Sequence, residues 1–263
     1  FRLRFLWRLF LLFLIGCFNG AFFPGDILVL YAIVGVILPL VCKWSDKAVL
    51  ITAVILMLQP VEWAKFLYAM NNPDYVAAPG QWLVHHRNMY PFLGQTDFWA
   101  MVKSNLWDGQ LFSLLWGWGH GRFFQTASLF LIGMLIGRRQ FFVDLSGHRK
   151  FWLRTLLISA VCFIPLYYFT EALPDLFTNK SMLSPLNTIF SSFRNFAFMC
   201  VLVAVFVFLW QQVSGHKVLH GLVPYGKMSL TNYLSQSIIG SFIYFCYGLS
   251  LYSELGVAAS FGV

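Results

Sequence analysis

The sequence predicts an all-α protein, a polytopic bundle of about seven transmembrane helices, and composition is the first reason. Hydrophobic residues make up 59% of the 263 residues and charged residues only 11%, whereas soluble domains carry about 25% charged residues. A soluble fold of this length could not bury so much apolar surface, because surface area grows quickly with mass. The second reason is a series of apolar runs punctuated by basic residues, a pattern typical of chains that cross a bilayer.

Seven apolar segments are long enough, alone or with their flanking residues, to span a hydrocarbon core of about 30 Å, which takes about 20 helical residues. They cover residues 5–23, 27–41, 48–70, 123–137, 151–170, 188–211 and 229–251. The second and fourth are short, and Trp44 and Phe141 are placed to bring them to the interfaces. We predict a single membrane domain over residues 1–263.

The connection between the first two segments consists of Pro24, Gly25 and Asp26. Proline and glycine favour a tight turn, and the carboxylate of Asp26 is placed to accept hydrogen bonds from the first backbone N–H groups of the next helix. We therefore expect the first two helices to be antiparallel neighbours.

Residues 71–122 form the one long segment that is not predicted to span the membrane. Within it, Phe98, Met101, Val102 and Leu106 recur at helical spacing, which predicts a short amphipathic helix lying along the outer interface. The alternative is an irregular loop packed on the bundle.

The net charge of +8 does not indicate a nucleic-acid partner, because the basic residues separate apolar runs instead of forming one face. With the start of the chain placed inside, twelve of the eighteen Lys and Arg residues fall on inner segments, among them Lys43, Arg138 and Lys217. Of the ten acids, only Asp46 and Asp144 do so. This distribution predicts a multi-pass protein of the inner (cytoplasmic) membrane, with the lipid bilayer as its partner.

Signatures of known cofactor and metal sites are missing. The sequence contains no GxSxG, P-loop, dinucleotide-binding or HExxH pattern. Its five cysteines are not spaced as CxxC, so packing as small apolar side chains is their favoured role. We therefore identify no cofactor and no metal site.

Ionisable residues near the ends of the predicted helices are the candidates for function, because such residues are costly in lipid. Three lie on the predicted outer side: Asp26, His120 and Arg122. Asp26 could act as a base or simply cap a helix, and Arg122 could hold an anionic substrate group or anchor the interface. His120 is the third catalytic candidate, although a lone histidine near an interface is more often structural. We expect Asp26 and Arg122 to lie close together, because opposite charges near a dry core favour pairing.

A second set of candidates, for binding, lies within the last two predicted helices. Arg194 is about two turns into the sixth helix, where it either snorkels to the interface or serves inside the bundle. Asn232 and Gln236 are four residues apart and share one helix face. Hydrogen bonding between helices and lining a substrate path are both open roles for them. We expect both to face other helices and not lipid.

Three blocks of residues carry a family resemblance. The first is GDIL at 25–28 followed by Tyr31 and Ala32, and the second runs from Gly121-Arg122 to 137–139. The third and most specific reads GKMSLTNYLSQS at 226–237. Together they resemble the YeiB-like family of bacterial multi-pass membrane proteins, whose C-terminal part is domain of unknown function 418.

The resemblance implies a distant similarity to membrane-bound acyltransferases that modify extracytoplasmic sugars. It therefore implies an acyltransferase-like enzyme that uses an acyl donor and acts on a glycan or lipid-linked acceptor, with the three outer candidates contributing. A transporter or flippase whose path is lined by the second set is the alternative, and a partner-binding membrane subunit is a third. We expect the chain to be a fragment that lacks the family's N-terminal part.

The charge distribution makes a testable prediction of topology. A cysteine placed at Ser45 should be shielded from a membrane-impermeant thiol reagent added outside the cell, because that segment is predicted to be cytoplasmic. A cysteine placed at Asn72 should react, because residues 71–122 are predicted to lie outside. The reverse labelling pattern would overturn the predicted orientation.

Overall fold

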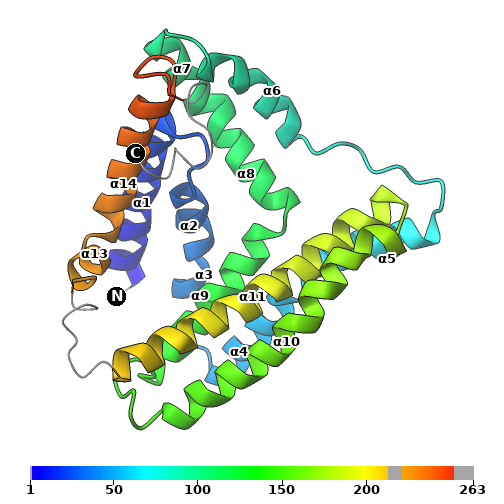
Figure 1. The fold of residues 1–263 in the computed structure, drawn as a ribbon, viewed down its shortest axis with the longest axis vertical. Coiled ribbons are helices and arrows are strands. Elements are labelled where there is room, and N and C mark those ends of the chain that lie inside the picture. Colours follow the sequence, from blue (N-terminus) through cyan, green and yellow to red (C-terminus); the bar gives the residue numbers. More distant parts are fainter. Residues whose placement is uncertain (1, 213–220, 252–263) are drawn as a thin grey trace. The chain divides into compact units, whose positions relative to one another are not determined.

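The computed structural model describes residues 2–212 and 221–251, and the regular secondary structure of these residues is entirely helical (Figure 1). Three helices are long and apolar enough to cross a membrane: α1 (Arg2–Phe22), α10 (Arg149–Leu176) and α11 (Lys180–Gln212). A fourth span is possible if α4 (Asp46–Met57) and α5 (Pro60–Asn71), bent by 40°, count as one. The all-α prediction is therefore confirmed and apolar helices of spanning length are present, whereas the count of seven spans is not confirmed.

The chain divides into two compact units. The first contains the described residues up to Val36, Pro79–Gly119 and those from Gly221 onward. The second contains Ile37–Ala78 and the described residues from His120 to Gln212. The prediction of one membrane domain stays a prediction.

In the first unit, α1 packs against α2 (Leu28–Gly35) and α14 (Ser229–Tyr244). A Cβ atom added at Gly16 would lie 2.9 Å from the backbone nitrogen of Val29, so a glycine is what lets α1 approach α2 this closely. The two helices run in opposite directions after the tight turn (Figure 1), which confirms that they are antiparallel neighbours.

The long segment between the predicted third and fourth spans is largely helical. It forms α6 (Trp82–Leu93), α7 (Phe98–Ser104), a π-helical turn (Asn105–Gly109) and α8 (Gln110–Gly119). The predicted helix around Phe98 is confirmed and continues to Gly119. Its start is fixed by Asp97, which accepts hydrogen bonds from the backbone nitrogens of Trp99 (3.0 Å) and Ala100 (3.1 Å). The alternative of an irregular loop is wrong for these residues, and helix α6 was not predicted.

Three predicted helices are interrupted or shorter than expected. The second is broken at Val36 into α2 and α3 (Ile37–Val41). The third is broken at Leu58–Gln59, where Gln59 takes a left-handed conformation (φ 57°) before Pro60, because proline fits the first turn of a helix but not its interior. The seventh ends at Tyr244, seven residues before its predicted end, and is followed by turns.

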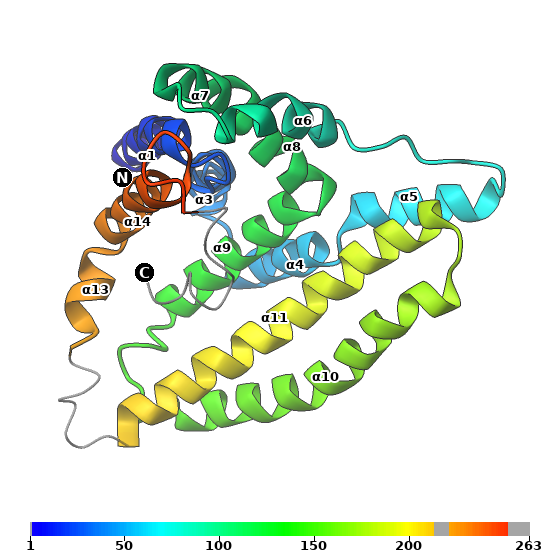
Figure 2. The ribbon, with the colours of Figure 1, turned by 45° about the horizontal axis from the view of Figure 1, so that its top comes forward.

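In the second unit, α10 and α11 lie side by side along most of their length (Figures 1 and 2). Helix α11 also packs on α5, and α4 packs on α9 (Arg122–Arg138). The α4–α9 contact is close: Ala53 and Leu131 are fully buried, and the hydroxyl of Ser128 donates to the carbonyl of Ala53 at 2.7 Å.

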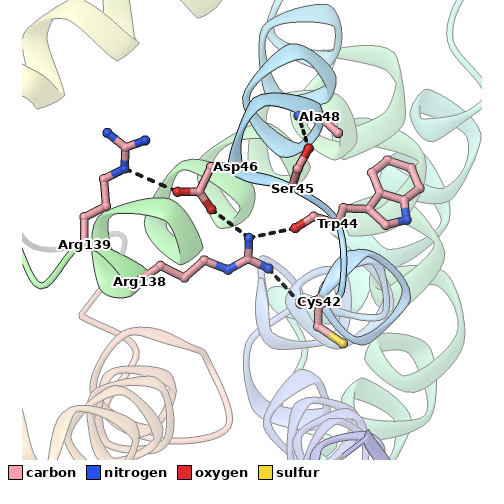
Figure 3. A network of polar contacts seen from close by, with 7 residues as sticks. All are labelled: Cys42, Trp44, Ser45, Asp46, Ala48, Arg138 and Arg139. Atoms are coloured by element: carbon pink, nitrogen blue, oxygen red, sulfur yellow. Dashed lines mark hydrogen bonds and ion pairs between the residues drawn. The ribbon is translucent and has the colours of Figure 1, made fainter.

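The C-terminal end of α9 is fastened to the turn between α3 and α4 by two arginines (Figure 3). Arg138 donates to the carbonyl oxygens of Cys42 (2.7 Å) and Trp44 (3.0 Å) and pairs with Asp46 (3.0 Å). Arg139 pairs with the other carboxylate oxygen at 3.3 Å. Asp46, Arg138 and Arg139, all of which lie on predicted inner segments, therefore form one network. Arg138 also satisfies carbonyl groups just beyond the end of α3.

The conformation of Gly121 at the start of α9 leads to a testable prediction of stability. Gly121 has a φ of +66°, and a Cβ atom there would lie 2.7 Å from the side chain of Gln59 and 2.9 Å from that of Thr188. Gly121→Ala should therefore lower the free energy of unfolding by about 1–3 kcal/mol, because both the backbone and the contacts are strained. Gly137→Ala is the control, because that helical position is open, and it should have no cost. Equal effects in detergent unfolding experiments would contradict the interpretation.

Candidate functional site

A buried carboxylate organises the first unit. Asp26 is 2% exposed, and its Oδ2 atom accepts hydrogen bonds from the backbone nitrogens of Leu28 (3.0 Å) and Val29 (3.3 Å) at the start of α2. Its Oδ1 atom accepts from Nδ2 of Asn19 (2.8 Å) and from the hydroxyl of Tyr233 (3.1 Å). The predicted capping role of Asp26 is confirmed, and two side-chain donors are added to it.

These donors come from helices that are far apart in the sequence. Asn19 lies one turn from the end of α1 and is fully buried, and its amide also donates to the hydroxyl of Ser237 at 3.2 Å. Tyr233 and Ser237 are four residues apart on α14, so they share one face. The Ser113 hydroxyl of α8 completes the arrangement by donating to the backbone carbonyl of Asp26 at 2.7 Å. Four helices therefore meet at one acidic residue.

A cavity of about 300 Å³ borders this cluster. Its lining comes from the end of α1 and from one face of α14, and includes Phe23, Tyr233, Gln236, Ser237 and Gly240. Tyr233 and Ser237 thus belong both to the cavity wall and to the network around the carboxylate. A small polar group in the cavity would lie beside the hydroxyl groups of Tyr233 and Ser237. The carboxylate of Asp26 lies behind Tyr233, which donates a hydrogen bond to it.

The electrostatics of Asp26 favour proton chemistry. Burial raises the pKa of its carboxyl group above the ordinary value, while the hydrogen bonds from Asn19, Val29, Tyr233 and Leu28 oppose that rise. A carboxylate with a raised pKa is a stronger base than an exposed one. Asp26 can therefore accept a proton more readily than a surface aspartate, and Tyr233 is the group in contact with it that reaches the cavity.

A second buried polar cluster lies in the second unit, at the break between α4 and α5. The amide nitrogen of Gln59 donates to the carbonyl of Gly121 (2.9 Å) and to the hydroxyl of Ser192 (3.1 Å). Gln125 donates to the carbonyl of Ser192 at 3.3 Å and accepts from Nη1 of Arg122 at 2.9 Å. These bonds tie the break between α4 and α5 to α9 and α11.

The candidates predicted from the sequence are divided between the units. Asp26 lies in the first unit, whereas His120, half-buried in the turn before α9, and Arg122, the first residue of α9, lie in the second. The expected proximity of Asp26 and Arg122 stays a prediction. Arg194 is ion-paired with Glu171 of α10 at 3.4 Å.

The two polar candidates on α14 differ from each other. Asn232 donates to the carbonyl of Tyr225 in the neighbouring α13 (Val223–Lys227) at 3.4 Å. Gln236 is exposed and lines the cavity. That both face other helices stays a prediction, as do their roles in binding. Lys217, counted among the inner charges, falls outside the described residues.

The residues missed by the sequence analysis are uncharged. Asn19, Gln59 and Gln125 are polar residues inside apolar segments, and that position alone was a usable signal, because an amide in lipid requires a partner. Tyr233 appeared only within the 226–237 block that carries the family resemblance, and no local pattern joins it to a carboxylate some two hundred positions away. Among the described residues, no group of three His, Cys, Asp or Glu side chains could hold a metal ion.

The helices and their buried polar clusters define the class as an all-α protein with helices suited to a membrane. Residues 136–263 match the DUF418 family, described as "Protein of unknown function (DUF418)". The resemblance in the sequence is thereby confirmed at the level of the family. The matched residues include α14 with Tyr233 and Ser237, whereas Asp26 precedes them.

One curated relative extends the similarity to nearly the whole chain. It is described as "Uncharacterized protein YxaH" from Bacillus subtilis (strain 168) and is 27% identical over 267 residues. The similarity covers 96% of this chain and 61% of the relative, so the chain spans about three fifths of that relative's length. No solved structure matches the chain.

The network around Asp26 makes a testable prediction. Asp26→Ala should lower the free energy of unfolding by about 2–4 kcal/mol, because it removes a helix cap, the acceptor of the Tyr233 hydroxyl and one of the two acceptors of the buried Asn19 amide. Asp97→Ala is a matched control: Asp97 also caps a helix of the first unit, but it is exposed and accepts only backbone hydrogen bonds. The control should cost about 0.5–2 kcal/mol, and equal losses in detergent unfolding experiments would argue against an organising role for the buried carboxylate.

Proposed function

We propose that the chain is the membrane-embedded part of an enzyme that transfers an acyl group to a hydroxyl acceptor, with its site in the cavity beside α14. The observation that carries the proposal is the contact of Tyr233 with buried Asp26 on one side and with the cavity on the other. Acyl transfer to an alcohol needs a base that takes the hydroxyl proton. A tyrosine backed by a carboxylate supplies that group.

The proposed step follows from these contacts. The oxygen of Tyr233 takes the proton of the acceptor hydroxyl while its own proton passes to Oδ1 of Asp26, 3.1 Å away. The acceptor oxygen attacks the carbonyl carbon of an acyl thioester, so that a C–O bond forms and the C–S bond breaks. The departing thiolate then takes the proton back from Asp26 through Tyr233. The products are an ester and a thiol, and both protein groups return to their starting states.

The surroundings support this role in two further ways. The backbone nitrogen of Ile27 donates to the oxygen of Tyr233 at 3.4 Å, which would stabilise negative charge as the phenolic proton leaves. Gln236 and Ser237 add polar groups to the cavity wall, where they could orient the acceptor. We also propose the cytoplasmic membrane as the location, with the seven predicted spans and an acceptor, such as a glycan or lipid-linked sugar, at the outer face.

Transport is the second candidate function, and a specific observation favours it. The α4–α5 pair is bent by 40° at a break that holds a fully buried Gln59 in a left-handed conformation. Broken helices with polar groups at the break are where many transporters bind their substrates. The cluster of Gln59, Gln125 and Arg122 would then bind the cargo, and Arg194, Asn232 and Gln236 remain the proposed path residues.

The proposed enzyme can be tested on membranes that contain the full-length protein. We expect label to move from a radioactive acyl thioester to an extracytoplasmic acceptor, and Tyr233→Phe to reduce the rate by about 10²-fold or more, the usual contribution of acid–base catalysis. Tyr225→Phe is the matched control, because Tyr225 is exposed on the adjacent α13 and contributes only its backbone carbonyl to Asn232.

Two outcomes would reject acyl transfer at this cavity. One is equal activity of Tyr233→Phe and Tyr225→Phe. The other is accumulation of an unmodified substrate in sealed vesicles, reduced by Gln59→Leu but not by Tyr233→Phe, which would favour transport.

A further inference from the structure

A second cavity lies in the second unit, between α9, α10 and α11. Its volume is about 590 Å³, within the range of pockets that bind small organic molecules. Apolar side chains form almost all of its lining, including Ile132, Ile136, Ile158 and Phe196. Its shape and chemistry suit a hydrocarbon chain, because such a chain makes no hydrogen bonds and gains from leaving water or from close packing.

The polar part of the lining is concentrated near the start of α10. Four lining side chains contain oxygen or nitrogen atoms: Trp152, whose indole N–H donates to the carbonyl of Phe141, and Arg154, Thr155 and Ser159. Arg154 is exposed, and its side chain makes no hydrogen bond or ion pair with any residue that the structure describes. A guanidinium at one place in an otherwise apolar wall is complementary to a molecule with a long apolar part and one anionic group.

The charges around Arg154 add to its preference for an anion. Arg149 and Lys150 precede it in the first turn of α10, which contains no acidic residue. The nearest acid in sequence, Asp144, is occupied locally, because it accepts hydrogen bonds from Ser146 (3.0 Å) and the backbone of Gly147 (2.9 Å). A helix N-terminus is itself electropositive, so this end of α10 offers an anion several favourable charges.

We propose that this cavity binds an anionic phospholipid, with one acyl chain between α9 and α11 and the phosphate at Arg154. The site lies in the second unit and does not depend on the proposed acyl transfer. Arg154 lies in the second turn of α10, a helix of spanning length, and a long basic side chain near the end of such a helix can reach the level of the lipid phosphates while the acyl chains enter the hydrocarbon region.

Two glycines on α9 allow a matched test of the chain-binding part. Gly133 lines the cavity and Gly137, one turn later, does not. A Cβ atom added at either position meets no atom within 4 Å. Gly133→Leu should therefore fill the cavity without disturbing the fold, and Gly137→Leu should add the same side chain outside it.

The test is a titration of delipidated full-length protein with phosphatidylglycerol, followed by native mass spectrometry. We expect Gly133→Leu to weaken binding by at least 10-fold and Gly137→Leu to leave it unchanged. Arg154→Gln should weaken phosphatidylglycerol by about 5-fold, the effect of one basic residue near an anionic headgroup, and leave diacylglycerol, which lacks the phosphate, unaffected.

Each alternative outcome overturns the proposal. Equal loss in both glycine variants, or no loss in Gly133→Leu, would mean that lipid does not occupy the cavity. No change in Arg154→Gln would mean that the phosphate lies elsewhere. Size-exclusion profiles and helical circular dichroism of every variant, compared with the unaltered protein, ensure that lost binding is not lost folding.

Discussion

A buried carboxylate needs donors, and in the first unit this need determines which segments come together. An ionised group removed from water is costly unless hydrogen bonds replace its hydration. Asp26 is almost fully buried and has four donors for its two oxygens. Two of them are backbone groups of the following helix, but the other two belong to α1 and α14. Helix α14 is thus tied to a turn near the start of the chain, although some two hundred residues separate them.

The second unit meets the same constraint with neutral groups. The break before Pro60 leaves backbone and amide groups in an apolar surrounding, where each must find a partner. Gln59 finds two, the carbonyl of Gly121 and the hydroxyl of Ser192. Gly121 itself must be a glycine because its φ is positive and Gln59 fills the space where a Cβ would lie. The bend of the α4–α5 pair and the glycine at the start of α9 are therefore parts of one arrangement.

Local chemistry explains how much of this could be predicted from the sequence. The Pro24-Gly25-Asp26 turn was predictable, because each residue acts on its immediate neighbours. So was helix α9, whose apolar run, although short for a membrane helix, is flanked by an arginine at each end. The break at Gln59 was missed although Pro60 signals it, because mostly apolar residues continue on both sides of the break. The helical segment before Thr188 was missed because polar residues and Pro185 interrupt its apolar residues, although the helix to which it belongs packs on α10 and α5.

The candidate site also shows that local sequence does not identify partners that are distant in the chain. Asp26 was a candidate because an acid in an apolar chain is conspicuous, and it proved to be buried with a cavity next to its partners. Asn19 was not a candidate, because one amide in an apolar run has many possible partners and the sequence does not say which is near. Long-range pairs of this kind become visible only when the fold places α1 beside α14.

The family match covers only part of the network around Asp26. The DUF418 match begins at residue 136, so it contains Tyr233 and Ser237 but not Asp26 or Asn19. Half of the network is therefore supplied by the part of the chain that defines the family and half by the part before it. The same division applies to the second cavity, because Gly133 and Ile132 lie just before the match and Arg154 within it. Neither site can be assembled from the matched region alone, which is a physical reason to treat the membrane segments before residue 136 as part of the same functional protein.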